Sequence, residues 1–110
     1  MGWLRVSARR RADGGLVVAL IGELDLAEVG RVSRRMAKLE QESPPVVYLD
    51  LRKLTFLDSS GLQALVDADT RGRAAGRRMV FIRGPSTVHR VFELTRLEER
   101  VEMLEDIPAE

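Results

Sequence analysis

The hydrophobic pattern of this chain alternates between a strand-like and a helical period, and this limits the folds open to it. Residues 16–21 form a continuous apolar run, which is typical of a buried strand, whereas the apolar residues between 26 and 39 recur as on one face of a helix. Further apolar runs, at 46–51 and 79–82, are each followed by a segment with helical spacing. Because strand-helix-strand units build mostly parallel sheets, the pattern predicts an α/β fold.

An N-terminal hairpin is expected to precede these units. Residues 3–9 alternate between polar and apolar side chains, as in a half-buried strand, and Asp13-Gly14-Gly15 is a strong turn signal before the run at 16–21. The predicted sheet is therefore small and mixed, with an antiparallel hairpin followed by strand-helix-strand units. We expect about three to four helices to back this sheet, crowded onto one of its faces.

Short-range signals place the ends of several elements. Asp25 is the expected N-cap of the first helix, with Glu28 completing a capping box and Leu26 opening the apolar face of the helix. Residues 54–57 are expected to be a connection that leads into the second helix, and residues 101–104 a short edge strand.

Composition narrows the class of protein. With 110 residues, 45% apolar and 32% charged, the chain is expected to form one globular domain, 1–110. The absence of cysteine excludes thiolate catalysis and cysteine-based zinc sites, and it agrees with a reducing cytoplasm. The 18 basic and 17 acidic residues leave no basic excess for nucleic acid, and no run approaches the roughly 20 apolar residues of a membrane span. We therefore expect a cytoplasmic protein that binds neither nucleic acid nor membranes directly.

The segment Asp58-Ser59-Ser60-Gly61-Leu62 stands at a predicted strand-to-helix turn. The first N–H groups of a helix are unpaired and carry the positive end of its dipole, so such a turn can hold a phosphoryl group on a serine. An ordinary capped helix start has the same appearance, and local physics alone favours that interpretation. Local chemistry also does not choose between Ser59 and Ser60.

Features of catalysis are missing from the sequence. The serine segment is not Gly-x-Ser-x-Gly, and the only histidine, His89, belongs to a different predicted helix, where a surface position is expected. The chain has no glycine-rich phosphate loop with lysine and no spacing typical of a metal site. We therefore predict a protein that is not an enzyme and that needs no metal or cofactor.

The chain resembles the anti-sigma factor antagonist branch of the STAS domain family. The resemblance runs nearly from end to end, through the segments at 22–25, 47–51, 54–62, 75–77 and 91–95, together with Pro85. The chain departs from the pattern of the family at two places, and both departures could change which partner is recognised. The third helix is followed by Leu94-Thr95-Arg96-Leu97 without the glycine of many relatives, and the second helix carries Asp67 and Asp69 where relatives are often more basic.

The resemblance implies a STAS-like fold and a phosphorylatable serine directly after the aspartate of the serine segment, which is Ser59. It also implies that the loop at 22–25 lies near this serine and joins it in a partner-binding face. The residues assigned to that face are Glu23, Asp25, Asp58, Ser59, Ser60, Gly61 and Leu62. Within it we expect Asp58 to shape the turn, Ser60 to cap the helix, Gly61 to let the partner approach, and Glu23 with Asp25 to contact a basic partner.

The function implied by the resemblance is that of a switch. The bare chain would bind an anti-sigma factor with serine kinase activity and so release a sigma factor. The kinase, using its own ATP, would phosphorylate Ser59 and abolish binding, and a serine phosphatase would reset the switch. One alternative is a STAS-type non-catalytic subunit of a lipid-transport complex or stress-sensing particle without a phosphoswitch. A more distant alternative is a serine hydrolase of unfamiliar layout.

Overall fold

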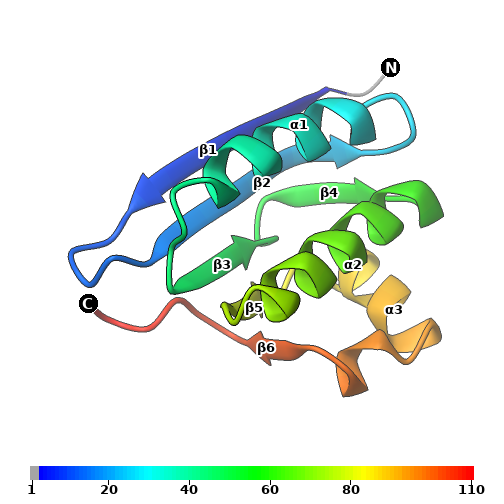
Figure 1. The fold of residues 1–110 in the computed structure, drawn as a ribbon. Helices are drawn as coiled ribbons and strands as arrows, with labels where there is room; N and C mark the ends of the chain where they lie inside the picture. The colour runs from blue at the N-terminus through cyan, green and yellow to red at the C-terminus, as the bar shows by residue number, and fades with distance from the viewer. Residues whose placement is uncertain (1–2) are drawn as a thin grey trace.

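A mixed β-sheet runs through the middle of the molecule, with helices packed against it (Figure 1). The computed structural model describes residues 3–110, which form six β-strands, three α-helices and one 3-10 helix. In chain order these are β1 (Leu4–Arg10), β2 (Leu16–Leu24), α1 (Val29–Glu40), β3 (Val46–Asp50), β4 (Leu54–Leu57), α2 (Ser59–Ala74), β5 (Arg78–Ile82), α3 (Ser86–Leu94), η1 (Leu97–Glu99) and β6 (Glu102–Leu104). No helix among these residues is long and apolar enough to cross a membrane.

The sheet has the strand order β1-β2-β3-β5-β6, and β4 pairs with the far end of β2. Strands β1 and β2 form the expected antiparallel hairpin, with the register running from Leu4 opposite Gly22 to Arg10 opposite Leu16. All other pairings are parallel. The predictions of a small mixed sheet, of an N-terminal hairpin and of a short edge strand near residue 102 are confirmed.

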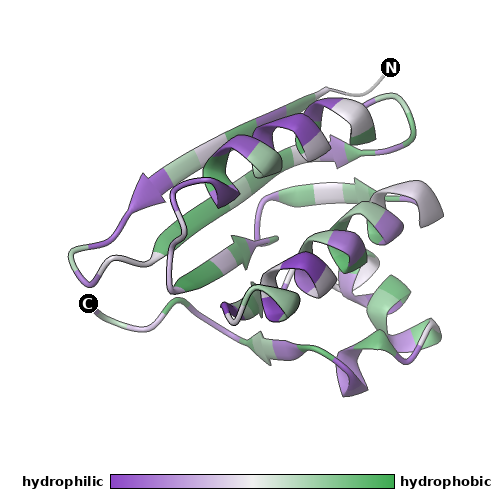
Figure 2. Cartoon of the chain, viewed as in Figure 1, coloured by the Kyte–Doolittle hydropathy of each residue, from purple (hydrophilic) through white to green (hydrophobic). Residues whose placement is uncertain are grey.

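The main core lies between the sheet and the helices. Buried side chains of α1, α2 and α3, among them Met36, Leu65 and Phe92, pack into one cluster with sheet residues such as Leu49 and Phe81. Phe81 and Phe92 meet edge to face, with ring centroids 5.6 Å apart. Figure 2 shows the matching pattern, with β2 and β3 largely apolar and the helices alternating in hydropathy along their length. The predicted crowding of the helices onto one face is therefore confirmed.

The opposite face of the sheet carries a smaller apolar cluster, which the C-terminal segment covers. Tyr48 and three strand residues form this cluster, and Ile107 packs against it. The buried guanidinium of Arg11 lies 4.9 Å from the centre of the Tyr48 ring and donates hydrogen bonds to the carbonyl oxygens of Pro108 and Ala109. Arg11 thus holds residues 107–109 over this face of the sheet, and this segment covers the smaller cluster in place of a helix.

The first helix begins later than the apolar pattern predicted. The Asp25 carbonyl accepts hydrogen bonds from the N–H groups of Glu28 and Val29, and Asp25 Oδ1 accepts one from Ala27. These bonds close a turn, so Asp25 does not act as the N-cap; that position is taken by Glu28, without a side-chain cap. Leu26 consequently lies outside the helix and is 70% exposed, and its expected place on the buried face was wrong.

The segment at 54–57 is a strand rather than a connection. Strand β2 has nine residues, but β3 pairs only with residues 16–19 of it. The remaining backbone groups at Gly22–Leu24 have no partner in β3, and β4 satisfies them by pairing in parallel, with Leu24 opposite Leu57. This pairing sets the start of α2 beside the end of β2.

Arg96 takes the backbone conformation that a glycine would hold without strain, because its φ of 59° lies in the left-handed region. Arg96→Gly is therefore expected to raise the free energy of unfolding by about 1 kcal/mol, measured by urea denaturation. The substitution also removes the ion pair between Arg96 and Glu99. Both of these side chains are exposed, so their ion pair contributes little to the free energy of unfolding. Arg96→Ala, which removes the ion pair and keeps the strain, should bring no gain; equal stabilisation by both substitutions would contradict this account.

Candidate functional site

The turn between β4 and α2 is organised by Asp58. Its backbone is extended, with φ −99° and ψ −179°, and its Oδ1 accepts a hydrogen bond of 2.8 Å from the N–H of Gly61. The carbonyl oxygen of Asp58 accepts the next bond, from the N–H of Leu62 at 2.9 Å. Asp58 is therefore the N-cap of α2, as its short acceptor side chain allows. The prediction that Asp58 shapes the turn is confirmed, and the one that Ser60 caps the helix was wrong.

Asp58 also ties this turn to the loop after β2. Its second carboxylate oxygen, Oδ2, accepts a hydrogen bond from the N–H of Leu26 at 3.2 Å, and its own N–H donates to the carbonyl of Leu24 at 3.3 Å. One side chain thus bridges the two segments that the resemblance brought together. The expectation that residues 22–25 lie near the serine segment is confirmed, but residues 22–24 are the end of strand β2 and not part of a loop.

Gly61 is buried where these two segments touch. A Cβ atom placed on Gly61 would lie 2.6 Å from the carbonyl oxygen of Leu24, 2.8 Å from Leu24 Cγ and 2.9 Å from Leu57 Cδ1. The missing side chain therefore allows close packing within this chain, which explains the glycine without a partner. Its expected role of letting the partner approach stays a prediction. Leu62 is only 9% exposed and belongs to the main core, and its assignment to the partner-binding face stays a prediction.

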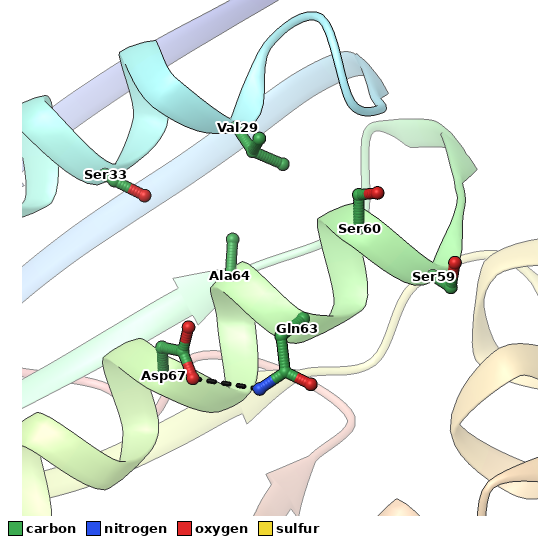
Figure 3. Close-up of a pocket in the computed structure, with 7 residues that line it drawn as sticks. All are labelled: Val29, Ser33, Ser59, Ser60, Gln63, Ala64 and Asp67. Atoms are coloured by element: carbon green, nitrogen blue, oxygen red, sulfur yellow. Dashed lines mark hydrogen bonds between the residues drawn. The ribbon is translucent and has the colours of Figure 1, made fainter.

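Ser59 and Ser60 differ in accessibility. Ser59 is the first residue of α2 and is exposed, whereas Ser60 is half-buried on the side of the helix that faces α1. Figure 3 shows both serines at one end of the gap between the two helices. An exposed hydroxyl on the first turn of a helix can be reached by a transferring enzyme, which favours Ser59 over Ser60 as the modified residue. The assignment itself stays a prediction.

A shallow groove of about 570 Å³ extends from the serines along the gap between α1 and α2. It is lined by Val29, Ser33, Ser59, Ser60, Gln63, Ala64 and Asp67. Beyond it, Arg71 of α2 donates two hydrogen bonds, of 3.0 and 2.9 Å, to the carboxylate of Glu40 on α1. The hydrogen bond to Glu40 raises the pKa of the Arg71 guanidinium.

Sequence reasoning missed most of this groove. Its lining residues on α1, Val29 and Ser33, are one helical turn apart, as are Gln63 and Asp67 on α2. This spacing marks a shared helix face and could have been read from the sequence. That the two faces meet each other follows only from the packing of α1 beside α2.

Carboxylates dominate the charge around Ser59. Glu23 is opposite Phe56 in the β2–β4 pair, Asp25 closes the turn before α1, and Asp58 caps α2. None of these three half-buried residues takes part in an ion pair within residues 3–110. The two segments at 22–25 and 58–62 thus carry three acidic residues and no basic one, although the charges of the whole chain nearly cancel.

His89 is buried on α3, so its expected surface position was wrong. The ring is 2% exposed and stacks on Phe92, with centroids 6.2 Å apart. Its Nε2 is 2.9 Å from a carboxylate oxygen of Glu98, while Nδ1 is buried and has no hydrogen-bond partner among the described residues. A proton on Nε2, donated to Glu98, is the tautomer that leaves no buried donor unpaired.

His89, Glu93 and Glu98 bring ligand atoms within 4.8 Å of one another, which is close enough for a metal ion. A metal on Nε2 would move the proton to Nδ1, where it would meet no acceptor within residues 3–110. Histidines that bind metals normally donate this second proton to a hydrogen-bond partner. The cluster therefore suits a metal poorly. Its hydrogen bond between His89 and Glu98 instead joins α3 to η1.

Comparison with known proteins finds a matching family model and solved structures with a similar fold. The family model described as STAS domain matches residues 7–108. An anti-sigma factor antagonist from Mycobacterium paratuberculosis is 24% identical, with a TM-score of 0.82 over 96% of this chain and 88% of that one. The anti-sigma factor antagonist SpoIIAA in its unphosphorylated form is 20% identical, with a TM-score of 0.76 over 93% of this chain and 90% of that one. The Bacillus cell fate determinant SpoIIAA in its phosphorylated form is 18% identical, with a TM-score of 0.71 over 93% of each chain. No curated protein gives a significant match.

Proposed function

This chain belongs to the STAS domain family, and on that premise we propose that it is an anti-sigma factor antagonist controlled by phosphorylation of Ser59. In the cytoplasm the bare form binds an anti-sigma factor that is also a serine kinase, and a sigma factor is released. The observation that carries the proposal is the exposed Ser59 on the first turn of α2, beside the loop that Asp58 fastens to it. Two chain segments, joined through Asp58, thus flank one modifiable hydroxyl.

Phosphorylation acts on this surface through charge. The kinase transfers the γ-phosphoryl group of its ATP to Ser59 Oγ, the hydroxyl proton leaves, and ADP is released. The phosphoserine then carries about −1.5 to −2 charges at neutral pH, next to the carboxylate of Asp58. No basic side chain is among the residues that line the groove at Ser59, so the groove itself supplies no cation to neutralise the new charge. Burying it in the partner interface is unfavourable, and the complex dissociates.

The relatives are consistent with such a switch, since SpoIIAA is known in an unphosphorylated and a phosphorylated form. A binding role also agrees with the position of His89, which is buried on α3 against Phe92 and Glu98 and so cannot act as a general base for Ser59. A serine phosphatase completes the cycle by hydrolysing the phosphoserine.

The experiment that tests the proposal is a capture from source-cell lysate with three baits, the parent, Ser59→Ala and Ser59→Asp, analysed by mass spectrometry. We expect the first two baits to hold an anti-sigma factor with a kinase domain and the third to lose it. If all three baits hold the same transporter or scaffold proteins, the chain is a STAS-type subunit of another assembly. Ser59 is then only part of a capped helix start.

A further inference from the structure

We propose that the groove between α1 and α2 receives a lysine or arginine side chain of the anti-sigma factor, and that Asp67 selects for it. This inference rests on the proposed function and adds a specificity site to it. The groove starts at Ser59 and Ser60 and continues along α2 to Asp67. A partner that covers Ser59 is therefore adjacent to the groove and can fill it at the same time.

The shape and lining of the groove suit a long basic side chain. Val29 and Ala64 provide short apolar walls, against which the methylene stem of a lysine or arginine can pack. Ser33 and Gln63 add polar atoms at the sides. Neither wall carries a large side chain that would fill the space, which remains open at about 570 Å³.

Asp67 supplies the charge that such a side chain needs. Its Oδ1 accepts a hydrogen bond of 2.9 Å from Gln63 Nε2, which fixes the carboxylate, and the other oxygen is turned toward the gap below α1 (Figure 3). Arg71, one turn further along α2, is already held by two hydrogen bonds to Glu40. The charge of Asp67 contributes to the raised pKa of Arg71, but Asp67 takes part in none of the ion pairs within residues 3–110. A held carboxylate therefore faces the groove with an open acceptor.

The charge pattern indicates a basic rather than an acidic or apolar occupant. The groove is lined by one carboxylate and by no basic residue, and it begins at Ser59, the neighbour in sequence of Asp58. A basic surface on the partner would thus place positive charge against Asp67 at one end of the groove and against Asp58 at the other. Phosphorylation acts at Ser59, whereas Asp67 determines which anti-sigma factor fits.

The test measures affinity by titration calorimetry, using the purified anti-sigma factor that the Ser59→Ala bait captures. Asp67→Asn is expected to weaken binding about tenfold and Asp67→Lys about 100-fold or more, because the second change also repels the incoming cation. Ala64→Leu, which fills the apolar part of the groove, should weaken binding as well. Glu105→Lys is the control of equal charge change outside the groove, and it should leave the affinity within about twofold.

A rescue separates a charge contact from a structural effect. Single Lys→Glu and Arg→Glu variants of the anti-sigma factor are tested against Asp67→Lys, and one of them should restore affinity to within about tenfold of the parent pair. If Asp67→Lys binds as tightly as the parent while Ser59→Asp does not bind, the groove proposal is overturned and the switch stands. If the Ser59→Ala bait captures no anti-sigma factor, both proposals are overturned.

Discussion

Ser59→Asp is expected to weaken binding to the anti-sigma factor by about 100-fold or more, corresponding to about 3 kcal/mol, whereas Ser59→Ala should bind as the parent does. The aspartate adds a charge at an exposed position that the partner covers, next in sequence to the carboxylate of Asp58 and at a groove that no basic residue lines. The measurement is the dissociation constant of each variant with the purified anti-sigma factor, at one fixed salt concentration because exposed charges are screened.

Ser86→Asp is the matched control for this prediction. Ser86 is the exposed first residue of α3, as Ser59 is of α2, so the substitution makes the same chemical change at the same position of another helix. It should leave the affinity within about twofold of the parent. A loss shared by both variants would show that added charge weakens binding wherever it is placed, and the special role of Ser59 would be refuted.

Gly61→Ala is expected to lower the free energy of unfolding by about 3 kcal/mol, because one methyl group must enter a contact that is already filled. The added Cβ would lie within 3 Å of the Leu24 carbonyl and of side-chain atoms of Leu24 and Leu57. Relief requires the end of β2 at Leu24 to move away from α2, which would also strain the bond between Asp58 and Leu26. Urea denaturation gives the stability, and affinity for the anti-sigma factor should fall as well.

Gly30→Ala controls for the general effect of replacing a helical glycine. Gly30 is exposed near the start of α1, and an added Cβ would meet only the flexible end of Arg34, at 3.3 Å. This substitution should be neutral or should stabilise the chain by up to about 1 kcal/mol. If Gly61→Ala were as stable as Gly30→Ala, the close contact between the serine segment and Leu24 would not exist.

The regular elements of the fold could be predicted because their signals are local. The apolar runs at 16–21 and 46–51 and the turn at Asp13-Gly14-Gly15 each lie within a few neighbouring residues, and each yielded an element of the right type. The elements placed wrongly depend on distant partners. Strand β4 has four residues and exists because the second half of β2 is left unpaired by β3, which no local pattern reveals.

The serine site was predictable in outline, and its internal roles were not. The sequence places Asp58, Ser59 and Ser60 at a helix start, but which side chain caps the helix depends on the extended backbone at Asp58. The burial of Gly61 depends on Leu24, which is remote in sequence, and that of His89 depends partly on Glu98, which lies on another element, η1. The partner-binding roles of Glu23 and Asp25 and the phosphorylation of Ser59 stay predictions, which binding experiments must test.

The most direct test of the switch is to prepare the chain with phosphoserine incorporated at position 59 and to measure its affinity for the purified anti-sigma factor. Chains with phosphoserine at position 86 and with no modification serve as references. The account predicts that phosphoserine at 59 abolishes measurable binding while the two references bind alike. Binding of the chain phosphorylated at 59 with the affinity of the unmodified chain would contradict it.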